Sequence, residues 1–238
     1  MKSPALSLLA LLPLTLAQAA NPAPHLEGDR PTLTIKKTVD PIMPHKLSEV
    51  GIQEGEVRVV IAVDSTGKLS EWLIVGYTHP GLADAVIAAL KQWEFDAPRW
   101  HGEPVSVQRE VKFNFETHGT VVSVAAVDAV ENYLVQRFPE RYVFRPCTLK
   151  ELDRIPTPLE AKKPEFAKRT AAQGVADVTV EFFIDETGVV RMPSLVEGDD
   201  PELAASSVAA VRQWRFEPPT RQGRRVLVRV QQTFHFQP

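Results

Sequence analysis

Two stretches of the chain alternate apolar residues with polar or small ones at every second position. They contain Val57, Val59, Ile61 and Val63 in the first half, and Val178, Val180, Phe182 and Ile184 in the second. Successive side chains of a strand point to opposite faces, so this period predicts two strands that each bury one face. An Asp-x-Thr-Gly sequence follows each strand, at residues 64–67 and 185–188. Aspartate and glycine favour tight turns, so we expect return strands over Leu69 to Val75 and Val189 to Leu195.

A helix and a last strand follow each predicted hairpin. In the second half Asp200 is a suitable N-cap and Pro201 a suitable first residue, and Leu203, Ser207, Val211 and Trp214 then lie on one helical face. The first half repeats this spacing with Pro80, Leu82, Val86, Leu90 and Trp93. After a loop with Pro98 and Gly102, or Pro219 and Gly223, we expect a long strand that ends in Phe113-x-Phe115 or Phe234-x-Phe236.

The two halves are copies of one module. A shift of 121 residues places Val63 on Ile184 and Trp93 on Trp214, and no gap is needed between Gly51 and Phe115. Upstream of Gly51 the match weakens. We therefore predict an α+β chain of two tandem modules, 41–117 and 158–238, each strand-strand-helix-strand with its helix packed on a three-stranded antiparallel sheet.

The segment between the modules, residues 118–157, has a different pattern. Its stretch from Ser123 to Arg137 is apolar at Val124, Val127, Val130, Leu134 and Val135, which indicates an amphipathic connecting helix. Four prolines from Pro139 to Pro158 then interrupt regular structure. One sequence does not decide whether this helix packs on a module or joins the two.

The first residues have the pattern of an export signal. Lys2 precedes an apolar stretch from Ala5 to Ala17, and Ala17-Gln18-Ala19 has the small-x-small form of a cleavage site. We expect residues 1–19 to be a signal peptide, residues 20–40 an extended leader, and the mature protein to be soluble and periplasmic. The alternative is an uncleaved inner-membrane anchor, although the apolar stretch contains Pro13 and is shorter than the roughly 20 residues that span a bilayer.

Composition and charge exclude several classes of function. The 238 residues are 44% hydrophobic, which supports packed cores and argues against disorder. A net charge of -3 provides no basic excess for nucleic acid. The single cysteine, Cys147, forms no internal disulfide, and the spacing of the six histidines matches no metal motif, so we expect no metal and no cofactor.

Residues of both copies resemble the C-terminal domain of TonB energy-transducer proteins. The resemblance lies in Pro44, Leu47, Gly51, Gly55, the Val-Asp-x-Thr-Gly hairpin, the Gln-Trp-x-Phe-x-x-Pro end of the helix and the final Phe-x-Phe, and residues 209–219 match best. It implies a periplasmic domain that binds a short peptide of an outer-membrane transporter by strand addition and transmits force from an inner-membrane motor. This chain has two modules where the family has one, and it shows no long Pro/Lys-rich spacer.

Several residues allow a chemical interpretation beside a structural one. Asp64 and Asp185 are symmetric like the paired aspartates of acid proteases, but turn aspartates explain both. Trp93, Trp214, Phe95 and Phe216 are typical of a core rather than a ligand pocket. A Ser-His-Asp triad has no Gly-x-Ser-x-Gly elbow to support it, and Cys147 has no neighbouring base. The arginines Arg221, Arg224, Arg225 and Arg229 suit either an anionic partner or a solvated loop.

The last strand of the second copy is the candidate partner site. Its inward face has Val230 where the first copy has Arg109, and Gln232 where the first copy has Val111, which suggests an edge or a partly covered face. We expect Val226, Val228, Arg229, Val230 and Gln232 to bind a peptide or protein partner, such as an outer-membrane transporter, by strand addition. The protein is then not an enzyme. The alternative is a structural periplasmic scaffold or homodimerisation module, because an exposed edge also pairs with itself.

Overall fold

The computed structural model describes residues 32–100, 102–116, 119–125, 142–165, 175–198 and 200–237. The segments interpreted as a signal peptide and as most of the connecting helix, residues 1–19 and 126–137, lie outside the described residues. Strands predominate over helices, so the predicted α+β class is confirmed. Within the described ranges, no helix combines the length and the apolar character needed to cross a membrane.

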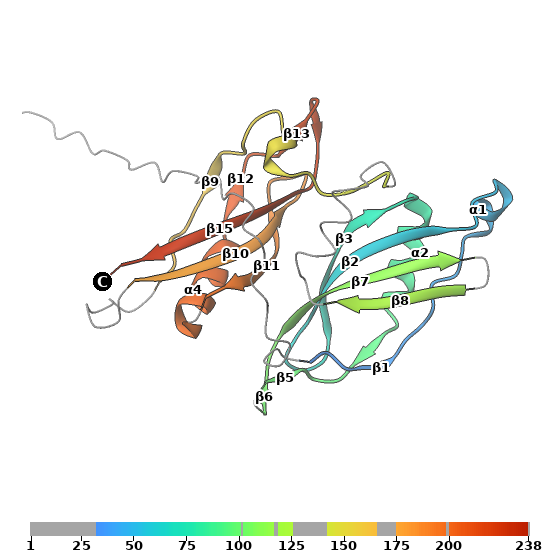
Figure 1. Ribbon diagram of the computed structural model, residues 1–238, viewed down its shortest axis with the longest axis horizontal. Coiled ribbons are helices and arrows are strands. Elements are labelled where there is room, and N and C mark those ends of the chain that lie inside the picture. The colour runs from blue at the N-terminus through green and yellow to red at the C-terminus, as the bar shows by residue number, and fades with distance from the viewer. Residues whose placement is uncertain are drawn as a thin grey trace, which may run out of the picture. The chain divides into compact units, whose positions relative to one another are not determined.

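The first module is a four-stranded antiparallel sheet with a helix on one face (Figure 1). Its strands are β2 (Gly55–Val63), β3 (Leu69–Tyr77), β7 (Val107–Glu116) and β8 (Gly119–Ala125), in the order β3-β2-β7-β8, and its helices are α1 (His45–Glu49) and α2 (Pro80–Leu90). The short strand β1 (Ile35–Lys37) pairs with β4 (Glu94–Phe95), and β5 (Arg99–Trp100) with β6 (Glu103–Pro104). β1 lies within the range assigned to the leader, and β8 within the range assigned to the linker.

The second module repeats this arrangement with one strand fewer. β10 (Ala176–Ile184), β11 (Val190–Glu197) and β15 (Val228–Phe236) form a sheet in the order β11-β10-β15, with α4 (Pro201–Arg212) beside it. β9 (Pro158–Glu160) pairs with β12 (Arg215–Phe216), and β13 (Thr220–Arg221) with β14 (Arg224–Arg225), while η2 (Leu149–Glu151) precedes them. The three-stranded sheet predicted for both modules therefore describes the second, whereas the first sheet has β8 in addition.

β8 also corrects the prediction of a helix from Ser123 to Arg137. The residues Ser123 to Ala125 are the end of this strand, which pairs with β7 from Glu116↔Gly119 to Glu110↔Ala125. The apolar spacing is compatible with a helix as well as with a strand. The backbone groups of Val121 and Ser123 pair instead with Asn114 and Lys112 along the edge of β7, so the segment is a strand.

Each module has its own core between helix and sheet. The alternating residues of β2 and β10 are buried, as the period predicted, and they pack on Leu82, Val86 and Leu90 of α2 or on Leu203 and Val211 of α4. Asp200 caps α4 by accepting hydrogen bonds from the amides of Glu202 and Leu203.

A third apolar cluster contains residues of both modules. It consists of Val60, Val75, Phe183, Met192 and Leu227, all buried. Val60 and Phe183 alternate with the core residues of their strands, so they occupy the sheet faces opposite the helices. The Nε of Arg191 also donates to Oε1 of Glu71 at 2.6 Å. The two modules therefore contact each other through their helix-free sheet faces.

Candidate functional site

β15 is an outer strand of the second sheet. It pairs with β10 without interruption from Ile184↔Val228 to Ala176↔Phe236. The opposite side of β15 is an edge of the sheet (Figure 1). Residues along a strand alternate in the side to which their N–H and C=O groups point, so only every second residue of β15 presents these groups at the edge.

The contacts of Cys147 show which residues these are. Its amide donates to the carbonyl oxygen of Leu227 at 2.8 Å, and its carbonyl oxygen accepts from the amide of Arg229 at 3.0 Å. The backbone N–H and C=O groups of Leu227 and Arg229 therefore point outward, away from β10. By alternation the backbone groups of Gln231, Thr233 and His235 point outward too, whereas those of Val228 and Val230 point toward β10.

The beginning of β15 is covered by residues 143–147, which we call the strap. The amide of Val143 donates to the carbonyl oxygen of Tyr77 on β3 at 3.0 Å, and the rings of Phe144 and Tyr77 stack with centroids 5.1 Å apart. Four residues later, Cys147 pairs with Val228 as a parallel bridge. The strap thus binds the outer edge of β3 and the first part of the β15 edge.

Beyond the strap, we call Gln231–His235 the open edge. No strand among the described residues pairs with its outer side. The Nε2 of Gln232 donates to the carbonyl oxygen of Thr233 at 2.8 Å, so one outward acceptor has a side-chain donor. From Val230 to Pro238 the sequence contains no lysine, arginine, aspartate or glutamate. Charged side chains commonly protect sheet edges from pairing, and this edge has none.

The corresponding edge of the first module is occupied. β7 matches β15 at the shift of 121 residues, and its register with β2 is the same, since Val59↔Val111 corresponds to Val180↔Gln232. β8 pairs with β7 opposite Glu110, Lys112 and Asn114, which correspond to Gln231, Thr233 and His235. One copy of the module therefore carries an added strand along the stretch that is open in the other copy.

The residues chosen from sequence lie on this strand, but the structure gives them different surroundings. Val228 and Val230 are buried in the second core, and Val226 packs against it. The Nη2 of Arg229 donates to the buried carboxylate of Glu181 at 2.5 Å. Of the five residues, only Gln232 lies within the open edge.

Sequence reasoning missed the outward residues Gln231, Thr233 and His235. A signal for them was present, because they alternate with the apolar residues Val230, Phe234 and Phe236. Their side chains lie on the helix-free face, where each has a partner on β10. Gln231 donates to Glu181 at 2.9 Å, the hydroxyls of Thr233 and Thr179 are 3.0 Å apart, and Nδ1 of His235 is 2.8 Å from Asp177.

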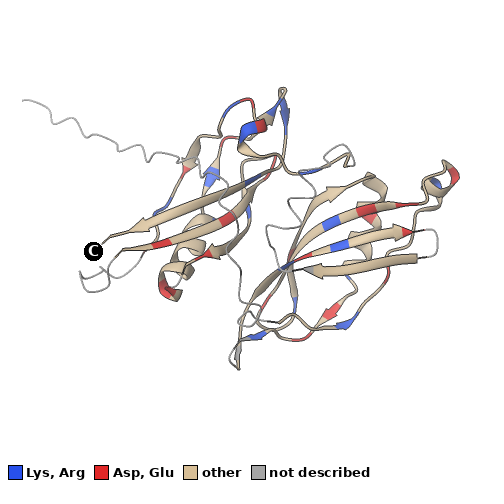
Figure 2. Cartoon of the chain, in the orientation of Figure 1, with Lys and Arg blue, Asp and Glu red and all other residues tan. Residues whose placement is uncertain are grey.

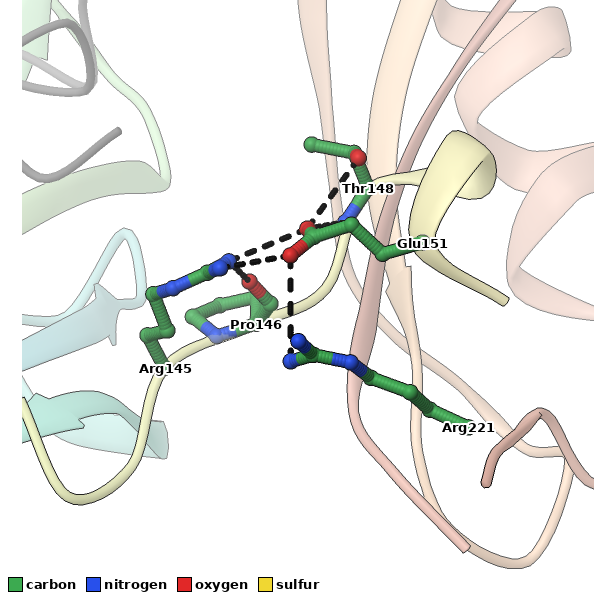
Figure 3. Close-up of polar contacts among 5 residues, drawn as sticks. All are labelled: Arg145, Pro146, Thr148, Glu151 and Arg221. Carbon is green, nitrogen blue, oxygen red and sulfur yellow. Dashed lines mark hydrogen bonds and ion pairs between the residues drawn. The ribbon is translucent and has the colours of Figure 1, made fainter. Parts of the chain in front are cut away.

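A polar cluster fixes the strap to the second module (Figure 3). The carboxylate of Glu151 accepts from the guanidinium of Arg145 at 3.0 and 2.5 Å and from the amide of Thr148 at 2.8 Å. Arg221 approaches the same carboxylate at 3.7 Å. The hydrogen bond from Arg145, more than any other contact, lowers the pKa of Glu151 to about 2. Glu151 is therefore ionised across the physiological pH range.

The other polar and aromatic candidates have structural surroundings. Asp64 and Asp185 each accept backbone hydrogen bonds inside their own turns. The hydroxyl of Thr66 contributes most to lowering the pKa of Asp64, followed by the amides of Lys68 and Thr66. Trp93 is buried in the first core, and its indole donates to the carbonyl oxygen of Val39 at 2.9 Å. Burial raises the pKa of the Cys147 thiol, which disfavours the reactive thiolate.

Comparison with known proteins gives one family. The family described as Gram-negative bacterial TonB protein C-terminal matches residues 44–117 and 162–238, which together are more than half of the chain. No curated protein matches the chain. The two matched segments contain the hairpin, helix and last strand of each module. The chain therefore belongs to the family of TonB C-terminal domains, which are envelope-associated, non-enzymatic protein-interaction domains of energy transduction.

Proposed function

We propose that this protein is exported to the periplasm and binds an extended segment of a protein partner by strand addition at the open edge, Gln231–His235. The partner is a protein of outer-membrane transport, and an outer-membrane transporter is the first choice. The family supports a role in envelope transport. The protein binds its partner without chemical conversion, and its affinity comes mainly from main-chain hydrogen bonds.

One observation supports this proposal above the others. The first module accommodates β8 on the edge that corresponds to the open edge of the second. The module is therefore compatible with a fourth strand at this position without rearrangement of its helix or hairpin. The open edge is also uncharged, as is β8 itself, so neither strand repels the other by charge.

The test uses two variants of Thr233 in the purified protein. Thr233→Pro removes the outward N–H but leaves the ladder to β10, because that amide points away from β10. Thr233→Val removes the same hydroxyl and keeps the N–H, so it is the matched control. Proline at Val228 or Val230 is unsuitable, since the amides there point toward β10 and their loss disrupts the module itself.

Binding is measured by fluorescence anisotropy with two kinds of labelled peptide. The first has the sequence of β8, residues 119–125, and the second kind is taken from periplasmic N-terminal segments of outer-membrane transporters of the same bacterium. We expect the protein and its Thr233→Val variant to bind, and Thr233→Pro to bind at least tenfold more weakly. Equal binding by the two variants, or no binding of any peptide, overturns the proposal.

The contacts between the modules favour a second function, a structural scaffold. The buried cluster of Val60, Val75, Phe183, Met192 and Leu227 and the strap couple the modules within one chain. A scaffold needs this coupling and no ligand. Cleavage at an engineered protease site near Pro156, followed by sedimentation, distinguishes the two. Halves that stay associated and bind no peptide favour the scaffold, and halves that separate while the second binds peptide exclude it.

A further inference from the structure

A hairpin rich in arginine lies directly before β15. β13 (Thr220–Arg221) and β14 (Arg224–Arg225) pair around Gln222 and Gly223, which have φ angles of +51° and +72°. From Arg221 to Arg225 every residue is exposed. Figure 2 shows the basic residues of this hairpin, at the end of the sheet where β15 begins.

The hairpin is held in place by the segment that precedes the second module. The two carboxylate oxygens of Asp153 accept hydrogen bonds from the amides of Gln222 and Gly223 at 2.7 and 2.9 Å. These bonds lower the pKa of Asp153, with that of Gly223 contributing most. The amide of Asp153 also donates to the carbonyl oxygen of Thr220 at 2.9 Å. The tip is therefore fixed in one conformation before any ligand arrives.

Most arginines of the hairpin form no ion pair within the described part of the chain. Arg221 lies 3.7 Å from Glu151, whose carboxylate Arg145 already binds through two hydrogen bonds. Arg224 and Arg225 form no ion pair with any described residue. The planar guanidinium groups of these exposed arginines are suited to carboxylates.

The first copy has a hairpin at the same place but without these three arginines. At the shift of 121 residues Arg221, Arg224 and Arg225 correspond to Trp100, Glu103 and Pro104. Gly102 has a φ of +87°, like Gly223, so the backbone of the turn is retained. Arg221, Arg224 and Arg225 are therefore not needed to form the hairpin, and these three positions are basic only in the copy whose edge is open.

We propose that the hairpin Arg221–Arg225 binds acidic residues that flank the segment of the partner on the open edge. This inference rests on the proposed function. From Gln231 back to Arg225 is six residues, about 20 Å of extended chain. A partner that continues beyond the strap by that length brings its carboxylates to the hairpin. The open edge then supplies hydrogen bonds that are independent of sequence, and the hairpin selects acidic partners and accelerates their association.

The test compares three peptides that share the sequence of β8, residues 119–125. One is unmodified, one has the extension Gly-Ser-Gly-Asp-Asp-Asp at its C-terminus, and one has three aspartates and the same spacer at its N-terminus. We expect one of the two extended peptides to bind about fivefold more tightly than the unmodified peptide at 50 mM salt, and the gain to disappear at high salt. The extended peptide that gains reports the direction of the bound strand.

The double variant Arg224→Gln, Arg225→Gln is the direct test. It keeps the backbone turn and Asp153, and we expect it to bind the unmodified peptide normally while losing the gain from the aspartates. The matched control is Arg212→Gln on α4, an exposed arginine away from β15, which should keep the gain. Binding of all three peptides with equal affinity overturns the proposal about the hairpin and leaves strand addition intact.

Failure of the proposed function gives a different result, because then the unmodified peptide does not bind.

A last measurement separates peptide from lipid as the source of negative charge. Vesicles of phosphatidylglycerol should not compete with the acidic peptide. Vesicles that bind the protein tightly, and lose it in the double variant, overturn an acidic peptide as the ligand of this hairpin.

Discussion

Gly188 shows how a single residue fixes the hairpin of the second module. Its φ is +89°, and a Cβ at this position would collide with the carbonyl oxygen of Phe216. The amide of Phe216 donates to the carbonyl oxygen of Gly188 at 2.9 Å, so the turn lies directly against the end of the helix-to-strand connection. The glycine of the Asp-x-Thr-Gly sequence is thus required for conformation and for close approach.

We predict that Gly188→Ala destabilises the protein by more than about 3 kcal/mol, because both the left-handed backbone and the collision contribute. Gly223→Ala is the control. Gly223 has a φ of +72° and nothing within 4 Å of its added Cβ, so only the conformational cost of about 1 kcal/mol applies. Urea unfolding of both variants measures the difference. Equal losses would contradict the role assigned to the contact with Phe216.

Glu151 gives a prediction about pH. Its pKa in the folded protein is about 2, below the ordinary value of 4.5. The ionised carboxylate therefore stabilises the fold fully above about pH 4.5, and this contribution is lost as the pH falls toward 2. After allowance for solvent screening of this partly exposed group, we expect Glu151→Gln to cost about 1 kcal/mol at pH 7.

The difference in unfolding free energy between the protein and Glu151→Gln should shrink below pH 4.5 and vanish near pH 2. Thermal unfolding over this range measures it. Glu186→Gln, at the exposed tip of a turn, is the control and should change stability little at any pH. A gap that stays constant down to pH 2 would mean that Glu151 acts through packing rather than through its charge.

At the scale of elements, the two last strands are the most informative pair. β7 and β15 match in register, but β7 has β8 beside it and β15 has the strap only at its beginning. The same strand is therefore internal in one copy and an edge in the other. Under the proposed function, this difference assigns partner binding to the second module.

Hydrogen exchange measures this difference directly. We expect the amides of Gln231, Thr233 and His235 to exchange nearly as fast as in an unfolded peptide, because they face solvent beyond the strap. The corresponding amides of Glu110, Lys112 and Asn114 should exchange at least about a thousandfold more slowly, because β8 covers them. The amides of Val230 and Gln232, which point toward β10, serve as slowly exchanging internal references. Slow exchange of all three outward amides of β15 would show that another part of the chain covers this edge.

The hairpin, helix and last strand of each copy could be predicted from the sequence, whereas β8 and the contacts of the strap could not. The alternation around Val59 and Val180, the turns and the helix caps are local signals, and each occurs twice. β8 occurs once, and the apolar spacing of Val121, Val124 and Val127 suits a helix as well as a strand, so only its pairing with β7 decides. The hydrogen bonds of Cys147 with Leu227 and Arg229 join residues about 80 positions apart, and no local pattern reports such a contact.

At the scale of the whole described chain, the helix-free sheet faces account for the contact between the modules. Phe183, Met192 and Leu227 of the second copy correspond to Ala62, Glu71 and Ser106 of the first. The second module thus has large apolar residues at three positions where the first module has small or charged residues. Glu71 is bound by Arg191 at 2.6 Å, so the charged residue of the first copy is used in the same contact.

We predict that Met192→Glu, which gives the second copy the residue of the first, uncouples the modules. Met192 is 1% exposed, and a carboxylate placed there among Val60, Val75 and Phe183 has no cation within the apolar cluster. We expect a loss of about 3 kcal/mol or more from the contact. Calorimetry should then show two unfolding transitions in place of one, and trypsin should cut between the modules faster.

Leu195→Glu provides the control for this change. Leu195 lies on the same strand, β11, but is 45% exposed, so the same carboxylate remains hydrated there and we expect little effect on unfolding or proteolysis. Peptide binding at the open edge should survive in Met192→Glu, because β15 keeps its pairing with β10. If binding is lost together with the contact, the first module and the strap are needed to shape the edge. The two modules then act as one binding unit, and the function cannot be assigned to the second module alone.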